Sequence, residues 1–248
     1  MPFRIAIPSY KRAQTLRKKT LTCLEREGVP LEWVEVFVAS EAERDLYREV
    51  CGDRIQIHVG VPGIHRQRQF IHDFYEEGER VFCMDDDIRA LRRCKEWAGV
   101  PLMDLLVRFF NLAEEEGCRL WGIYPTDHGL QLKPRGVVGL RYCIGSCFGM
   151  KNWKGTEYPY PTTEDFVRTL EAYRLDGRVL RFEGVGPTTT YFKEPGGLQE
   201  YRTAERQDAE MTALVNEYPA LVVPRYREGR YSDVRFKVKT EKVIVIVP

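Results

Sequence analysis

Three consecutive aspartates, Asp85, Asp86 and Asp87, follow the mostly apolar run RVFCM at residues 80–84. Adjacent carboxylates repel one another, and this repulsion destabilises their ionised forms. A divalent cation would offset the repulsion, because hard cations take oxygen ligands. On an extended segment residues i and i+2 face the same side, so Asp85 and Asp87 can hold a cation together while Asp86 points elsewhere. The triplet predicts a manganese or magnesium site; the alternative is a solvated acidic turn that closes a strand.

The segment PSYKR, residues 8–12, is a second polar cluster, and Pro8, Ser9, Tyr10 and Arg12 are its candidate binding residues. A loop at the end of a strand can offer backbone amides and a hydroxyl to a base and to phosphates. Arg12 can pair with two phosphate oxygens at once. The alternative is a polar turn in which Arg12 opens a helix.

A third cluster begins at Gly63 in the segment GIHRQR. If a helix starts after this glycine, its first amides point outward and form an anion site. Arg66 and Arg68 are two positions apart, so they do not share a helix face. We therefore expect at most one of them to reach a ligand.

Glu164 and Asp165 are the candidate catalytic pair. A carboxylate beside an acceptor hydroxyl can take its proton as a general base. Asp165 is the first choice for this role and Glu164 the reserve. The alternative is structural, because Thr162 with Asp165 three positions later also forms a helix-capping pattern.

The segment from residue 225 to 242 is basic, with seven Lys and Arg residues against three Asp and Glu residues and aromatic residues between them. Cations for phosphates and aromatic rings for stacking suit contact with nucleic acid. The candidate residues for that contact are Arg227, Arg230 and Lys237. The alternative is a solvated edge strand whose lysines block further pairing.

The elements that must position these residues follow from the apolar pattern. Strands are predicted at 3–7, 33–39, 55–59 and 80–84, and helices at 13–27, 40–50 and 64–75. Strands that alternate with helices indicate a parallel sheet with crossover helices. Ligands bind at the carboxyl ends of such strands, where both PSYKR and the aspartates lie.

The second half is less regular. Its predicted helices cover 101–116, 162–176 and 203–218, its predicted strands 120–124, 137–145 and 179–182, and residues 191–201 form a Gly/Pro loop. The predicted fold class is α/β, a single domain over 1–248 with a mixed, mainly parallel sheet flanked by helices.

The composition sets outer limits on function. The net charge of +1 excludes a global field for nucleic acid, so any such partner must meet a local patch. Seven cysteines without a CxxC pair indicate reduced, mostly buried thiols. The N-terminus has no long apolar run, and VIVIV at 243–247 is too short to span a bilayer. We expect a soluble cytoplasmic protein without a membrane partner, in the host cytoplasm if a phage encodes it.

Four segments, in this order, resemble the GT-A glycosyltransferases: IAIPSYKR (5–12), GIHRQRQF (63–70), FCMDDDI (82–88) and TEDFVRTL (163–170). The resemblance covers about residues 1–185. Within that fold, the IPSYKR opening and the glycine pair at 196–197 resemble the phage and kinetoplastid branch associated with TET/JBP oxygenases. Enzymes of that branch are thought to glycosylate hydroxymethylated pyrimidines in DNA, as in base J synthesis.

The resemblance implies a GT-A, Rossmann-like fold with a nucleotide-sugar half at 1–100 and an acceptor half at 101–248. It implies a UDP-sugar donor, a Mn or Mg cofactor and 5-hydroxymethylcytosine or a related base in DNA as the acceptor. Asp85 would touch the ribose or the metal, Asp87 the metal, and Arg68 would stand where the family has its usual arginine. Many GT-A enzymes add a late histidine to the metal site, but no histidine follows His128 here, so the third protein ligand is left open. The implied donor-binding residues are Pro8, Ser9, Tyr10, Arg12, Gly63, Arg66, Arg68, Asp85 and Asp86.

Three alternatives remain at the level of sequence. The same enzyme could act on a saccharide, lipid-linked or protein acceptor. The chain could instead be a non-catalytic module that binds a nucleotide sugar or nucleic acid. A sugar nucleotidyltransferase shares the sheet but usually carries a Gly-rich segment after the first strand, and PSYKRAQ contains no glycine.

Overall fold

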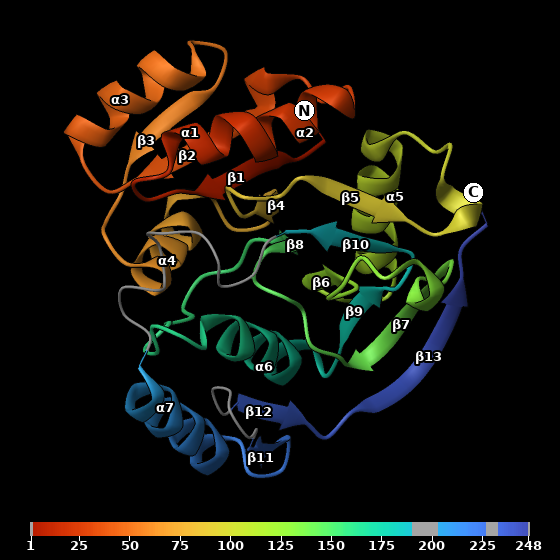
Figure 1. The fold of residues 1–248 in the computed structure, drawn as a ribbon. Helices are drawn as coiled ribbons and strands as arrows, with labels where there is room; N and C mark the ends of the chain where they lie inside the picture. The colour runs from red at the N-terminus through yellow and green to blue at the C-terminus, as the bar shows by residue number, and fades with distance from the viewer. Residues whose placement is uncertain (1, 190–202, 227–232, 248) are drawn as a thin grey trace.

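A nine-stranded sheet runs through the computed structural model, which describes residues 2–189, 203–226 and 233–247 (Figure 1). The strand order is β13-β7-β9-β6-β8-β4-β1-β2-β3. Only β8 and β7 oppose the direction of the other seven strands, as their antiparallel pairing with both neighbours shows. The predicted α/β class with a mixed, mainly parallel sheet is confirmed.

The first half forms the parallel part of the sheet. Its strands are β1 (Arg4–Pro8), β2 (Val34–Val38), β3 (Gln56–Val59) and β4 (Arg80–Met84). Its helices are α1 (Ala13–Leu16), α2 (Thr22–Arg26), α3 (Glu41–Cys51) and α4 (Ile64–Phe74), with a short 3-10 turn at Leu31–Trp33. The β1–β2, β1–β4 and β2–β3 pairs are all parallel, as the strand–helix alternation predicted.

The helix predicted at 13–27 is interrupted. Between α1 and α2 lies one π-helical turn, η1 (Arg17–Leu21). Within it the buried Thr20 hydroxyl donates to the carbonyl of Asp85 at 2.8 Å and accepts from the amide of Ile88 at 2.9 Å. The irregular turn thus ties this helix to the segment that carries the aspartates.

The second half adds mixed strands and two small ribbons. Its strands are β5 (Ala90–Arg93), β6 (Leu120–Ile123), β7 (Arg135–Leu140), β8 (Cys147–Lys151), β9 (Val179–Phe182), β10 (Val185–Thr188), β11 (Val222–Arg225), β12 (Asp233–Phe236) and β13 (Lys239–Val245). Its helices are α5 (Leu102–Glu115), α6 (Glu164–Asp176) and α7 (Ala204–Glu217), with 3-10 turns η3 (Lys95–Trp97) and η4 (Gly129–Gln131). β5 pairs with β10 and β11 with β12 outside the main sheet.

Two predictions for this half are corrected. The single strand expected at 137–145 is β7 followed by a non-strand segment, residues 141–146, and then β8, because the chain leaves the sheet there to pass beneath α6. The basic tail contains β13, which pairs with β7 at the border of the sheet. Residues 239–245 are therefore the edge strand that the sequence left as an alternative.

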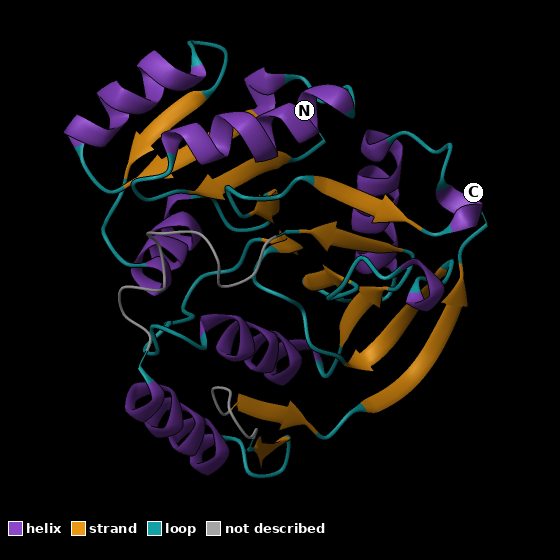
Figure 2. Ribbon diagram, viewed as in Figure 1, coloured by secondary structure: helices purple, strands orange, loops and turns teal. Residues whose placement is uncertain are grey.

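Helices cover both faces of the sheet (Figure 2). One core packs α1–α3 and α5 on one face, and a second packs α4 and α6 on the other. A third cluster joins α6 and α7 to the β11–β12 ribbon. All seven cysteines are buried free thiols, as predicted. No helix in the described ranges has the length and apolar character that a membrane crossing needs.

Candidate active site

The carboxyl ends of the adjacent parallel strands β1 and β4 bring the two polar clusters together. The Ser9 hydroxyl donates to Asp86 Oδ2 at 2.5 Å, and Arg12 Nη1 lies 3.4 Å from Asp86 Oδ1. Asp86 is 4% exposed, and burial raises its pKa to about 6 although Arg12 and Ser9 lower it. Asp86 thus fastens the PSYKR loop to the triplet and does not face outward.

Tyr47 on α3 is a further part of this loop that the sequence did not reveal. It is fully buried, and its hydroxyl lies 2.7 Å from Ser9 Oγ and accepts from the amide of Arg12 at 2.9 Å. The sequence of this helix carries no signal for these hydrogen bonds. Lys11, with φ of 56°, makes the left-handed turn that lets the loop fold over Tyr47.

Asp85 lies in a different environment, against the buried Arg68 of α4. Arg68 Nη2 donates to Asp85 Oδ1 at 2.7 Å and to the carbonyl of Gly145 at 2.8 Å. The Asp85 side chain is 36% exposed and that of Arg68 only 2%. Desolvation raises the pKa of Asp85 above its ordinary value, against the lowering effect of Arg68 and with the help of Asp87 and Asp86.

Asp87 is half-buried, and no group in the described ranges hydrogen-bonds its carboxylate. Asp85 and Asp87 therefore offer carboxylate oxygens that suit a hard divalent cation. No group of three or more His, Cys, Asp or Glu side chains forms a ready metal cluster in the described part of the chain. A cation such as Mg²⁺ is commonly held by one or two carboxylates together with substrate phosphates and water.

Asp165, in the first turn of α6, is held by three donors. Its Oδ2 accepts from the Tyr142 hydroxyl and from the amide of Gly145 at 3.2 Å, and its Oδ1 accepts from the amide of Phe166 at 2.9 Å. The capping pair of Thr162 with Asp165, which the sequence left as an alternative, does not form, because the Thr162 hydroxyl donates instead to Glu210 at 2.5 Å. The helix cap is Thr163, which makes no side-chain capping bond.

Gly145 joins the two carboxylate groups into one site. Its carbonyl accepts from Arg68, the partner of Asp85, while its amide donates to Asp165. A Cβ on this residue would lie 3.2 Å from the Cβ of Asp165 and 3.3 Å from a carboxylate oxygen of Glu164. The absence of a side chain therefore lets residues 141–146 pack closely against the start of α6.

Glu164 is buried, and burial and the neighbouring Asp165 raise its pKa to about 7. Behind it lies Arg168, fully buried, with its guanidinium 3.6 Å from the ring centre of Phe148. None of the three Arg168 nitrogens has a hydrogen-bond partner among the described residues. Arg168 and Arg68 both act to lower the pKa of Glu164, so this carboxyl titrates between two buried cations.

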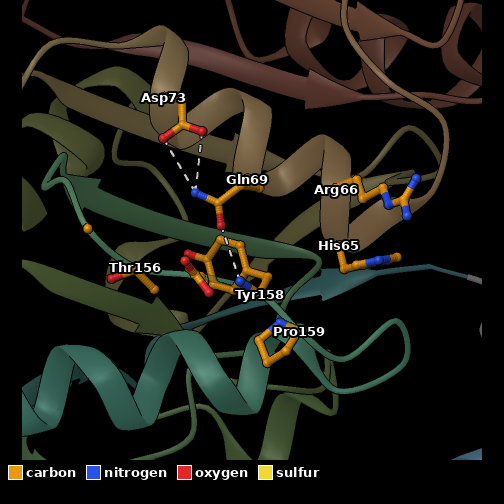
Figure 3. Close-up of a pocket in the computed structure, with 9 residues that line it drawn as sticks. His65, Arg66, Gln69, Asp73, Thr156, Tyr158 and Pro159 are labelled. Atoms are coloured by element: carbon orange, nitrogen blue, oxygen red, sulfur yellow. Dashed lines mark hydrogen bonds between the residues drawn. The ribbon is translucent and has the colours of Figure 1, made fainter.

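Arg66 and Arg68 point in different directions, as their spacing predicted. Gly63, with φ of 92°, caps α4, and the exposed Arg66 lines a separate pocket of about 560 Å³. Figure 3 shows Arg66 and His65 at one end of this pocket, and Gln69 bonded to Asp73 and Tyr158. Arg68, and not Arg66, belongs to the Asp85–Gly145 cluster. The pocket is lined by His65, Arg66, Gln69, Asp73, Gly155, Thr156, Glu157, Tyr158 and Pro159.

The predicted acceptor residues are only partly placed. Arg227 and Arg230 lie outside the described residues. Lys237 is exposed, and its ammonium donates to the carbonyl of Pro219 at 2.8 Å. Phe236, one of the aromatic residues of the basic segment, is 6% exposed and packs in the α6–α7 cluster, so its ring is not available for stacking on a base.

Comparison with protein families and with curated proteins gave no match. Among solved structures, S. aureus TarS 1–349 in complex with UDP has a TM-score of 0.54 at 17% identity, over 87% of this chain and 66% of that one. Mannosyl-3-phosphoglycerate synthase from Rubrobacter xylanophilus has a TM-score of 0.53 at 11% identity, over 98% and 85%. Glucosyl-3-phosphoglycerate synthase from Mycobacterium tuberculosis, with Mn²⁺, UDP and its product, has a TM-score of 0.51 at 11% identity, over 98% and 89%.

These similarities define the class of fold. The chain has the GT-A fold of the nucleotide-diphospho-sugar transferases, and its structural neighbours are glycosyltransferases. It spans 66% of the TarS structure that it matches. At such low identity the likeness establishes the fold, and the site residues must carry the argument for activity.

Proposed function

We propose that the chain is a metal-dependent glycosyltransferase that moves a sugar from a UDP-sugar to a hydroxyl acceptor. The observation that supports this proposal is the Gly145 bridge, because its carbonyl accepts from Arg68, the partner of Asp85, and its amide donates to Asp165. UDP and Mn²⁺ in the neighbouring glucosyl-3-phosphoglycerate synthase support the choice of donor and metal.

In this proposal the β1 and β4 ends hold the donor. Asp85 and Asp87 would hold a divalent cation, which when bound neutralises charge on the departing diphosphate. The loop at Ser9 and Tyr10, with Arg12, would bind the nucleotide, since Asp86 and Tyr47 fix its shape. Gly63 at the start of α4 would add outward amides, and Arg66 stays a predicted donor-binding residue.

Asp165 is the proposed base. It is half-buried, and its three donors fix the direction of its carboxylate. A fixed carboxylate next to the acceptor hydroxyl can take the proton as the sugar is attacked. Glu164 lies deeper, and its raised pKa of about 7 leaves it partly protonated at neutral pH. We therefore assign to Glu164 an electrostatic effect on Asp165 and not the proton transfer itself.

For the acceptor we propose 5-hydroxymethylcytosine or a related hydroxymethylpyrimidine in DNA, which rests on the resemblance of IPSYKR and the glycine pair to the TET/JBP-associated branch. The test is to incubate the protein with hydroxymethylcytosine DNA, Mn²⁺ and a panel of nucleotide sugars, and to weigh the released nucleosides. A mass increase of one hexose, dependent on metal and UDP-sugar, supports the proposal. Sugar release without DNA labelling would redirect it to a saccharide, lipid-linked or protein acceptor.

A further inference from the structure

Exposed cations lie in a row beside the metal-site aspartates, on elements that the proposed chemistry does not use. The row begins at Arg89, two residues after Asp87, continues through Arg92 on β5 and ends at Lys95, and Arg26 of α2 joins it from the side. We call these four residues the basic strip. All four side chains are exposed.

The hydrogen bonds of this region fix the strip in place. Arg26 Nη2 donates to the carbonyl of Arg89 at 2.9 Å, and the amide of Arg89 donates to the carbonyl of Thr188 on β10 at 2.8 Å. Leu91 is buried, so the alternation of β5 turns Arg92 outward. Figure 1 shows β5 leaving the end of β4 and running away from the aspartates, so the strip leads outward from the site.

Apart from the aspartate triplet itself, the acidic residues near the strip are mostly neutralised. Glu27 pairs with Arg93 at 2.5 Å and Glu25 with Arg17 at 2.9 Å, and the exposed Glu96 stands beside Lys95. The strip therefore keeps an excess of positive charge in a chain whose net charge is only +1. A local field of this kind attracts a polyanion and not a single small anion.

The length of the basic strip and the lack of exposed apolar side chains near it favour nucleic acid as its ligand. Strand β5 extends over about 13 Å at roughly 3.3 Å per residue, the length of about four base pairs, and Arg89 and Lys95 lie just beyond its two ends. A membrane-surface site would combine cations with exposed large apolar side chains. In the described part of the chain the large exposed apolar residues lie elsewhere, none of them on α2, β5 or η3.

We propose that the basic strip is the surface on which the phosphate backbone of acceptor DNA docks, with the target base directed toward Asp87 and Asp165. This inference rests on the proposed function and places its acceptor beside the metal site. The strip differs in place from Lys237, the tail candidate among the described residues, because Lys237 follows β12, and α6 lies between β12 and the end of β4 in Figure 1. Contacts to phosphate make the docking independent of base sequence.

The experiment compares two triple variants with the same change of charge. Arg89→Glu/Arg92→Glu/Lys95→Glu removes the strip, and Arg48→Glu/Lys133→Glu/Lys151→Glu reverses exposed cations elsewhere. Binding to a labelled hydroxymethylcytosine duplex is measured over a salt series. The strip variant should bind at least about tenfold more weakly, with a log–log salt slope smaller by about two to three, because each lost phosphate contact removes about 0.9. The charge-matched control should keep the wild-type slope.

The other outcomes overturn the inference in distinguishable ways. If the strip variant binds like wild type while Lys237→Glu weakens binding, the tail is the docking surface and DNA remains the acceptor. If wild-type protein binds no DNA but still releases UDP from a UDP-sugar with metal, both the strip and the DNA acceptor fail while the glycosyltransferase proposal stands. If the strip mediates binding to anionic lipid vesicles and not to DNA, its partner is a membrane surface.

Discussion

Three adjacent aspartates with the same chemistry occupy three different environments. Asp86 is buried against Ser9 and Arg12, Asp85 pairs with the buried Arg68, and Asp87 has no hydrogen-bond partner in the described ranges. Substituting each aspartate should therefore have a different effect, although nothing in their sequence positions predicts that difference.

Asp87→Ala should abolish sugar transfer and weaken metal-dependent UDP binding without destabilising the fold, because it removes one charge from a repelling cluster. Asp85→Ala should also stop transfer, but it deprives the buried Arg68 of a partner and should lower the free energy of unfolding by about 1–3 kcal/mol. Urea unfolding and calorimetric titration of UDP with Mn²⁺ measure the two effects. An Asp87→Ala protein with wild-type turnover would end the metal assignment.

Asp165→Asn should lower turnover by about 10²–10⁴ and leave donor affinity unchanged, because asparagine can keep the one acceptor oxygen that Tyr142 and Gly145 share and loses only the bond from the Phe166 amide. Glu164→Gln serves as the neighbouring control and should retain activity. Initial rates at saturating donor, with UDP affinity measured separately, distinguish the two. An inactive Gln variant beside an active Asn variant would identify Glu164 as the base.

The dependence of rate on pH gives a second test of this pair. The raised pKa of Glu164, about 7, means that this residue gains its negative charge as the pH rises through neutrality. That charge strengthens the attraction of Asp165 for the acceptor proton, so the wild-type rate should climb from pH 6 to 8. The climb should be absent in Glu164→Gln, and an identical profile in the two proteins would refute this coupling.

At the scale of elements, two irregular segments build the site from regular ones. The π-helical turn η1 turns Thr20 toward residues 85–88, and the non-strand segment 141–146 brings Gly145 between Arg68 and Asp165. π-turns of this kind are frequent at functional sites. Neither segment contributes a reacting group, but each fixes the position of the groups that do.

Thr20→Val should lower the free energy of unfolding by about 1–3 kcal/mol, because it leaves a buried carbonyl and a buried amide without their partner. It should also weaken metal-dependent UDP binding, since residues 85–88 lose their anchor. Thr22→Val is the matched control, because Thr22 is exposed and its hydroxyl bonds only within the helix region, to the carbonyl of Arg17. Equal free energies of unfolding for the two variants would show that the Thr20 hydrogen bonds do not contribute to stability.

At the scale of the whole molecule, burial makes ionisation of carboxyl groups in the site less favourable than in the unfolded chain. The pKa values of the buried Asp86 and Glu164 are raised, to about 6 and about 7. Between about pH 4 and 7 these two carboxyl groups therefore bind more protons in the folded chain than in the unfolded chain. Their stabilising contribution is full below that window and is lost as pH rises through the folded-state values.

Metal binding should reverse this trend, because a cation requires ionised carboxylates. The rise in melting temperature on adding Mn²⁺ and UDP should be larger at pH 8 than at pH 5.5, and Asp87→Ala should lose most of it. Differential scanning fluorimetry at the two pH values gives the comparison. A shift of equal size at both pH values would show that these carboxyls do not titrate with metal binding.

The sequence by itself determined the fold class and most of its elements. Strand β4 was predicted with its observed bounds, and β9 likewise, because buried strands leave continuous apolar runs. The polar clusters at 8–12 and 85–87 could also be assigned to strand ends, since the carboxyl ends of parallel strands share one edge.

Only the tertiary structure decided which of these residues meet. Tyr47, Tyr142, Gly145 and Arg168 lie far along the chain from the aspartates and match no local pattern, because their roles come from contacts between elements. The orientation of Phe236 into the core likewise depends on α6 and α7 and not on its own segment. Local periodicity fixes which face of an element is buried, but hydrogen bonds between distant elements fix the geometry of the site.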